Sequence, residues 1–104
     1  MIARTWRAAA TRDGAERYEV HFRDAVLPEL RSLRGFHRAL LMRRGDGDRV
    51  EIEVLTLWES REAVVEFTGA AMDLAVVEPA ARAVLLEYDK TVNHSEAIEF
   101  TGER

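Results

Sequence analysis

The sequence contains no cysteine, which excludes disulfides, thiolate metal ligands and cysteine nucleophiles. It contains one lysine, Lys90, and its arginines are dispersed among a larger number of acidic residues. With a formal net charge of -4, it lacks the clustered positive charge that binding to nucleic acids or anionic membranes requires. No apolar run could cross a bilayer, and no charged start precedes an apolar segment. We therefore expect a cytoplasmic protein with no nucleic-acid partner and no membrane partner.

The composition is typical of a folded domain. Of the 104 residues, 47% are hydrophobic and 33% are charged, which is far from the composition of a disordered chain. This length predicts a single domain over residues 1–104. Residues 101–104 form a polar tail that we expect to fray.

The clearest pattern lies in the middle of the chain. Side chains alternate from Val50 to Trp58, which is the period of a strand. From Ala63 to Phe67 apolar residues recur at three and four residues, which predicts a helix with Ser60 as its N-cap. Trp58 therefore lies at an abrupt junction between strand and helix.

The N-terminal part predicts a strand followed by a long helix. Ile2–Ala10 is the expected strand, and Asp13 and Glu16 have the spacing of a capping box at the start of the helix. Pro28 cannot donate to the carbonyl four residues back, so the helix should kink or restart there. We expect the helix to end before Gly35.

The remaining elements follow from shorter signals. Phe36–Arg44 predicts a second strand, and residues 45–48 predict a tight hairpin turn to the third. Pro79 favours a short helix to about Leu86. Tyr88-Asp89-Lys90 predicts a turn, and Thr91–Phe100 predicts the last strand.

The order β-α-β-β-α-β predicts a ferredoxin-like sandwich of the α+β class. Its four-stranded antiparallel sheet would carry both long helices on one face. The second and third strands are nevertheless apolar on both faces at their centres, which leaves an apolar face uncovered. This face predicts a homodimer through packing on another copy. Its expected polar rim consists of Glu51, Glu53, Arg38 and Arg43.

Three segments carry a resemblance to a known family. They are Ile2-Ala3-Arg4-Thr5-Trp6-Arg7, Arg34-Gly35-Phe36, and Leu57-Trp58-Glu59-Ser60 followed by Ala63 and Phe67. In these segments the chain resembles the antibiotic biosynthesis monooxygenase (ABM) family of the dimeric α+β barrel superfamily. The resemblance extends over nearly the whole chain. It implies a homodimer whose sheets form a joint barrel, with a pocket between helices and sheet in each protomer.

Family members that act on aromatic polyketides need no metal or flavin, so the resemblance implies an enzyme without cofactors. The substrate anion gives an electron to dioxygen, and the protein supplies a dry cavity, a base and hydrogen-bond donors. Trp58 matches a tryptophan of that pocket. Two polar positions of the family, four residues before and six after it, are Val54 and Val64 here. Haem-degrading members carry a histidine after the second helix, whereas residues 72–81 contain none.

Three aromatic residues are candidates for substrate binding. They are Trp58, Phe67 and Trp6, although an aromatic residue at a strand-to-helix junction more often belongs to an ordinary core. His94 is the candidate catalytic base, because it shares a strand face with apolar residues and titrates near neutral pH. A hydrogen-bonded structural histidine is the commoner alternative.

The other histidines, His21 and His37, are weaker candidates. The three histidines share no short spacing and no neighbouring carboxylate pattern, so we predict no metal site. Ser60 is already assigned to a helix cap, and the glycines of a nucleophile elbow are absent, which argues against a serine hydrolase.

The leading hypothesis is a cofactor-free monooxygenase-like protein that acts on a small aromatic or enolisable metabolite. The alternative is a non-catalytic dimeric binding or assembly module of the same fold, and Val54 and Val64 favour it. A cavity below about 300 Å³ would also favour the module. A third hypothesis, an isomerase or lyase, would act without oxygen.

Overall fold

The alternation in the central strand decides which side chains are buried. The structure, a computed structural model, describes residues 1–45 and 47–103. Every second residue from Val50 to Trp58 is buried, as the sequence pattern predicts. The elements are β1 (Ile2–Ala10), α1 (Arg12–His21), η1 (Phe22–Val26), α2 (Leu27–Arg31), β2 (Phe36–Arg44), β3 (Val50–Trp58), α3 (Arg61–Thr68), α4 (Pro79–Arg82), β4 (Glu87–Tyr88) and β5 (Asn93–Glu96).

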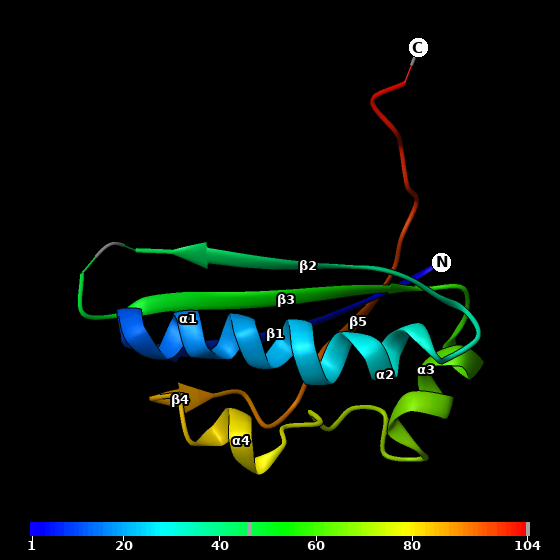
Figure 1. The fold of residues 1–104 in the computed structure, drawn as a ribbon. Coiled ribbons are helices and arrows are strands. Elements are labelled where there is room, and N and C mark those ends of the chain that lie inside the picture. The colour runs from blue at the N-terminus through cyan, green and yellow to red at the C-terminus, as the bar shows by residue number, and fades with distance from the viewer. Residues whose placement is uncertain (46, 104) are drawn as a thin grey trace.

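The sheet has the strand order of a ferredoxin-like fold. β3 lies between β2 and β1, and β4 and β5 both pair with the other edge of β1. All of these pairs are antiparallel. Figure 1 shows the helices together on one side of the sheet. The predicted α+β class and ferredoxin-like arrangement are confirmed, but the sheet has five strands instead of four.

The fifth strand arises because the edge strand is broken. Between β4 and β5, the indole Nε1 of Trp6 donates to the carbonyl oxygen of Asp89 at 2.7 Å. The backbone N–H of Val92 donates to the carbonyl oxygen of Asp73 at 3.0 Å. The backbone N–H of Asp89 still donates to the carbonyl oxygen of Arg7 in β1 at 2.9 Å. Beyond Asp89 the backbone bonds to a side chain and to a loop, and pairing with β1 resumes only at Asn93.

Several predictions for the C-terminal third are therefore wrong. Tyr88 belongs to β4 and not to a turn. The last strand was expected over Thr91–Phe100, but β5 spans only Asn93–Glu96. The helix that begins at Pro79 ends at Arg82, before the expected Leu86, with its last carbonyls bonded to the following turn.

Helix α1 begins at a different cap from the one predicted. The hydroxyl oxygen of Thr11 accepts from the backbone N–H of Gly14 at 2.9 Å, so Thr11 is the N-cap. The predicted capping role of Asp13 is wrong. Asp13 lies in the first turn, where a carboxylate interacts favourably with the helix dipole. It also forms an ion pair with Arg17 at 2.9 Å.

Pro28 changes the type of helix that follows α1. It has no N–H to donate to the carbonyl of Asp24. Just before it, the N–H of Leu27 donates to the carbonyl oxygen of Phe22, five residues back, so η1 is a π-helical turn. Pro28 then lies in the first turn of α2, in agreement with the predicted restart.

Two local predictions concern chain reversals near β3. Ser60 caps α3 as expected, because its hydroxyl oxygen accepts from the N–H of Ala63 at 3.2 Å. The predicted hairpin turn begins at Gly45, whose φ of 107° favours glycine. Asp46, in the same predicted turn, lies outside the described residues.

The sheet face away from the helices carries exposed apolar side chains. Leu40 is 51% exposed and lies opposite Leu55, while Met42 is 40% exposed. Arg43, predicted for the rim of this face, lies opposite the buried Ile52 and contacts Glu19 of α1 at 3.4 Å. The rim prediction is therefore wrong for Arg43, because its register turns it toward the helices.

Beyond β5 the chain leaves the sheet. Figure 1 shows this C-terminal segment running away from the helices. Ile98 and Phe100 are 82% and 87% exposed, and Glu99 pairs with Arg38 of β2 at 3.0 Å. No helix in the described part of the chain has the length and apolar character needed to span a membrane.

The helix cap provides a test of the fold. We expect Thr11→Ala to lower the free energy of unfolding by about 1 kcal/mol, because the N–H of Gly14 loses its partner. Asp13→Ala should cost only about 0.3–0.5 kcal/mol, since it removes an exposed ion pair with Arg17. Urea unfolding of both variants measures the difference. If Asp13→Ala lowered the free energy of unfolding more than Thr11→Ala, Asp13 and not Thr11 would be the N-cap.

Candidate functional site

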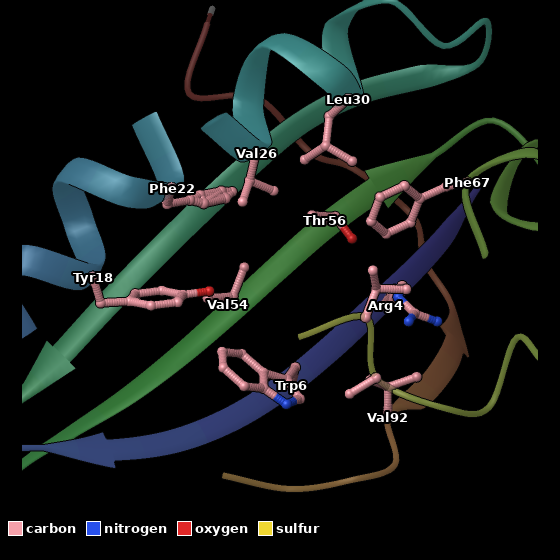
Figure 2. A pocket seen from close by; sticks show the side chains of 12 residues that line it. Arg4, Trp6, Tyr18, Phe22, Val26, Leu30, Val54, Thr56, Phe67 and Val92 are labelled. Carbon is pink, nitrogen blue, oxygen red and sulfur yellow. The ribbon is translucent and has the colours of Figure 1, made fainter. Parts of the chain in front are cut away.

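A cavity lies between the long helix and the sheet. Its volume is about 60 Å³, which is room for roughly four to six water molecules. Figure 2 shows its lining side chains converging from the helices above and the strands below. They are Arg4, Trp6, Tyr18, Phe22, Val26, Leu30, Val54, Thr56, Phe67, Ala75, Val76 and Val92.

The register of the sheet positions the strand side of the cavity. Arg4 lies opposite Thr56, and Trp6 lies opposite Val54, so these four side chains project from the same face. The other side comes from α1, η1 and α2, and irregular chain between α3 and α4 closes one end. Most of the surface is therefore aromatic or aliphatic.

Arg4 is the one charged side chain among these lining residues. It is 6% exposed. Its guanidinium donates to the carbonyl oxygens of Met72 at 2.6 Å and Leu74 at 2.9 Å, and lies 5.9 Å from the centre of the Phe67 ring. Burial lowers the pKa of Arg4 to about 10, against a smaller opposing effect of Asp73. Arg4 thus remains a cation at neutral pH.

His94 lies behind Arg4 and is not in the cavity lining. Its Nε2 is 3.0 Å from the Nη1 of Arg4, and its Nδ1 is 3.7 Å from an oxygen of Asp73. Because Arg4 can only donate, Nε2 is the acceptor and the neutral ring carries its proton on Nδ1. Burial lowers the pKa of His94, Arg4 and Arg61 lower it further, and Asp73 opposes them. His94 is therefore neutral at pH 7.

Two neutral polar groups also reach the cavity. Burial raises the pKa of Tyr18 above its ordinary value, so its hydroxyl stays protonated. Within the described residues this hydroxyl has no hydrogen-bond partner, and Figure 2 shows it pointing toward the strands. The second polar group is the hydroxyl of Thr56 on β3, whose oxygen accepts from the indole Nε1 of Trp58 at 2.9 Å.

The three predicted substrate-binding aromatics occupy two layers. Trp6 and Phe67 line the cavity. Trp58 is completely buried behind them, stacked on Phe67 at 5.8 Å and edge-on to Phe36 at 5.4 Å between ring centres. Trp58 can therefore act on the cavity only through Phe67 and through its hydrogen bond to Thr56.

A smaller recess of about 40 Å³ adjoins the cavity and shares Trp6, Tyr18 and Phe67 with it. His21 lines this recess, and its Nε2 is buried without a hydrogen-bond partner in the described chain. The third histidine, His37, is exposed on β2. Within the described ranges, no three His, Asp or Glu side chains gather in a metal-binding group.

Arg4 and Tyr18 line the cavity but were not predicted as site residues from the sequence. A signal was present for Arg4, because it shares an alternating strand face with Ile2, Trp6 and Ala8. A charge among apolar residues on the face that turns to the helices indicates either a buried ion or a functional group. Tyr18 gave no such signal, since a tyrosine on a helix is ordinary core.

Comparisons with known proteins find similarity in structure alone. Neither a protein-family profile nor a curated protein sequence matches the chain. Among solved structures, SnoaB, a cofactor-independent oxygenase from Streptomyces nogalater, matches with a TM-score of 0.65 and 16% identity over 98% of both chains. A Bacillus cereus protein assigned as an antibiotic biosynthesis monooxygenase matches with a TM-score of 0.64 and 17% identity, over 96% of this chain and 97% of its own.

The chain has the fold of the antibiotic biosynthesis monooxygenases. An asparagine-to-alanine variant of SnoaB matches similarly, with a TM-score of 0.62 and 19% identity over 98% of this chain and 97% of that one. The resemblance to the ABM family that the sequence indicated is thus confirmed at the level of the fold. At these identities, the likeness carries no residue roles from one ABM protein to this one.

The buried histidine of this ABM fold should make stability depend on pH. Folding lowers the pKa of His94. Below about pH 6.5, the unfolded chain therefore binds a proton at His94 more readily than the folded chain does. The stability linked to neutral His94 is thus present above that pH and is lost as the pH falls through the folded-state pKa. We expect wild type to lose more stability than His94→Gln between about pH 7 and about pH 5. Urea unfolding at each pH measures the loss, and the exposed-site variant His37→Gln should behave like wild type.

Proposed function

We propose that this protein is a cofactor-free, monooxygenase-like enzyme whose cavity takes a small enolisable or aromatic metabolite. The observation that carries this proposal is a largely apolar cavity with one buried cation, in a fold shared with cofactor-independent oxygenases. Apolar surroundings exclude water, and a fixed cation can stabilise an enolate or phenolate oxygen. Such an anion is electron-rich enough to reduce dioxygen without help from a cofactor.

The reaction balances with the substrate as the only reductant. A substrate CH₂ group beside a carbonyl loses a proton, and its enolate combines with O₂ to give a hydroperoxide after protonation. Loss of water from this hydroperoxide leaves a second carbonyl. Overall, CH₂ and O₂ become C=O and H₂O, so one oxygen atom enters the substrate and the other leaves as water.

The size of the cavity limits the substrate. A volume of 60 Å³ is well below the roughly 300–1,000 Å³ of typical ligand pockets, so it favours a short enolisable compound over a fused aromatic one. A larger ring would require the irregular chain between α3 and α4, which includes Ala75 and Val76, to move outward.

The same volume favours a second candidate, a non-catalytic binding or assembly module. The apolar residues Val54 and Val64 agree with it, because both are buried where oxygenases of the family use polar groups. The two candidates differ in one measurable property, which is oxygen consumption in the presence of an oxidisable substrate.

The first test is oxygen uptake with a panel of small 1,3-dicarbonyl compounds, anthrones and quinols. We expect uptake above the buffer rate with at least one of them, and no product when oxygen is removed. Product without oxygen would indicate an isomerase or lyase. No uptake with any compound would favour the module.

The second test concerns the base. His94 is the base predicted from sequence, but its Nε2 already accepts from Arg4. If His94 is the base, His94→Gln should lose nearly all activity, a fall of about 10²-fold or more. If His94 instead positions Arg4, the glutamine oxygen can accept the same hydrogen bond and activity should persist. His21→Gln tests the alternative base beside the cavity, and His37→Gln is the control.

We also propose that the protein is a homodimer through the sheet face away from the helices. The exposed Leu40 and Met42 support this arrangement, and so does the projecting segment with Ile98 and Phe100. A bare apolar face of this kind is unusual in a monomer. A partner sheet would cover it and leave the cavity on the opposite face accessible.

Sedimentation tests the dimer. We expect wild type to sediment as a dimer at micromolar concentration and Leu40→Glu as a monomer, because the new charge would be buried in the interface. Val20→Glu is the matched control, since Val20 is 46% exposed on the outer side of α1. Wild-type protomers that sediment alone would contradict the proposal.

A further inference from the structure

The charge of Arg4 has no counter-charge in contact. Arg4 is buried, and within the described residues no carboxylate forms a salt bridge with it. Its hydrogen-bond partners are two carbonyl oxygens and the neutral ring of His94. Buried charges in proteins are normally paired, because desolvation is costly without an opposite charge nearby.

Asp73 does not supply that counter-charge. Its side chain is 87% exposed, and one of its carboxylate oxygens lies 3.7 Å from the Nδ1 of His94. The ring of His94 therefore lies between the carboxylate and the guanidinium. Water around an exposed carboxylate screens its effect on a buried group.

Arg4 retains hydrogen-bond donors for another partner. A guanidinium has five N–H groups, and the three contacts described above use three of them. Arg4 also lines the cavity, together with the unpartnered hydroxyl of Tyr18. The cavity thus contains a cation without an anion and a donor without an acceptor.

We propose that the cavity binds its ligand as an oxyanion, with the negative oxygen against the guanidinium of Arg4. A carboxylate and an enolate each present a negatively charged oxygen to the guanidinium. Tyr18 is the second hydrogen-bond donor to the ligand. The short aliphatic or vinylic body lies between Trp6 and Phe67. This inference rests on the proposed function in that it concerns the same cavity, but it specifies the charge of the ligand and not its turnover.

The test compares two probes of equal size and different charge. Sodium butyrate and butyramide each have six non-hydrogen atoms, which suits the small volume of the cavity. Binding is followed by NMR at constant ionic strength, through the indole N–H of Trp6 in the cavity lining. We expect butyrate to bind at least about tenfold more tightly than butyramide.

Two arginine variants show whether Arg4 is responsible. Arg4→Met should abolish the preference for butyrate, and Arg4→Lys should retain part of it. Arg7→Met is the matched control, because it removes the same charge from the same strand. The side chain of Arg7 is 74% exposed. The control should bind butyrate like wild type.

Several outcomes would overturn the inference. They are equal affinity of wild type for the two probes, no binding of butyrate, and loss of binding in Arg7→Met. The wild-type comparison decides the matter even if Arg4→Met fails to fold. An anion preference without oxygen uptake would leave this inference standing and refute the oxygenase proposal. Oxygen uptake without an anion preference would refute this inference and support the oxygenase proposal.

Discussion

The unbroken antiparallel pairing of β1 with β3 is the constraint on which the site depends. It runs from Ile2 opposite Trp58 to Ala10 opposite Val50, without a shift. A slip of one residue would turn every side chain of β1 to the other face. Arg4 would then lie outside, and the cavity would lose its charge. The register is secure because a period-two pattern of apolar residues on both strands is buried against the helices.

The same patterns explain which parts of the fold can be predicted from sequence. β1, β2 and β3 have the expected bounds, because each is nine residues long and each is bounded by a clear change of pattern or by turn residues. The cap of α1 was misassigned because Thr11 and Asp13 both suit an N-cap, and only the geometry distinguishes them. The break between β4 and β5 could not be predicted, since it depends on hydrogen bonds to Trp6 and to a loop far away in sequence.

The candidate site was less predictable than the fold. The sequence indicated Trp6 and Phe67, which line the cavity, but it could not show that Trp58 lies one layer behind them. It gave no reason to expect that Arg4 would be buried without a carboxylate. That arrangement links site and fold, because Arg4 also donates hydrogen bonds to two carbonyls of the loop after α3, and the next residues of this loop line one end of the cavity. The same cation therefore stabilises the loop and sets the electrostatic character of the interior.

The broken edge strand also affects how the sheet meets other chains. An uninterrupted edge offers a row of free backbone groups on which a foreign strand can assemble. Along β4 and β5 that row is interrupted, and the backbone near Asp89 and Val92 is already engaged. The opposite edge, β2, is nine residues long, and it carries a bulge near His37 and several arginines. Aggregation by strand addition is thus confined to one side of the molecule, where positive charge and irregular geometry oppose it.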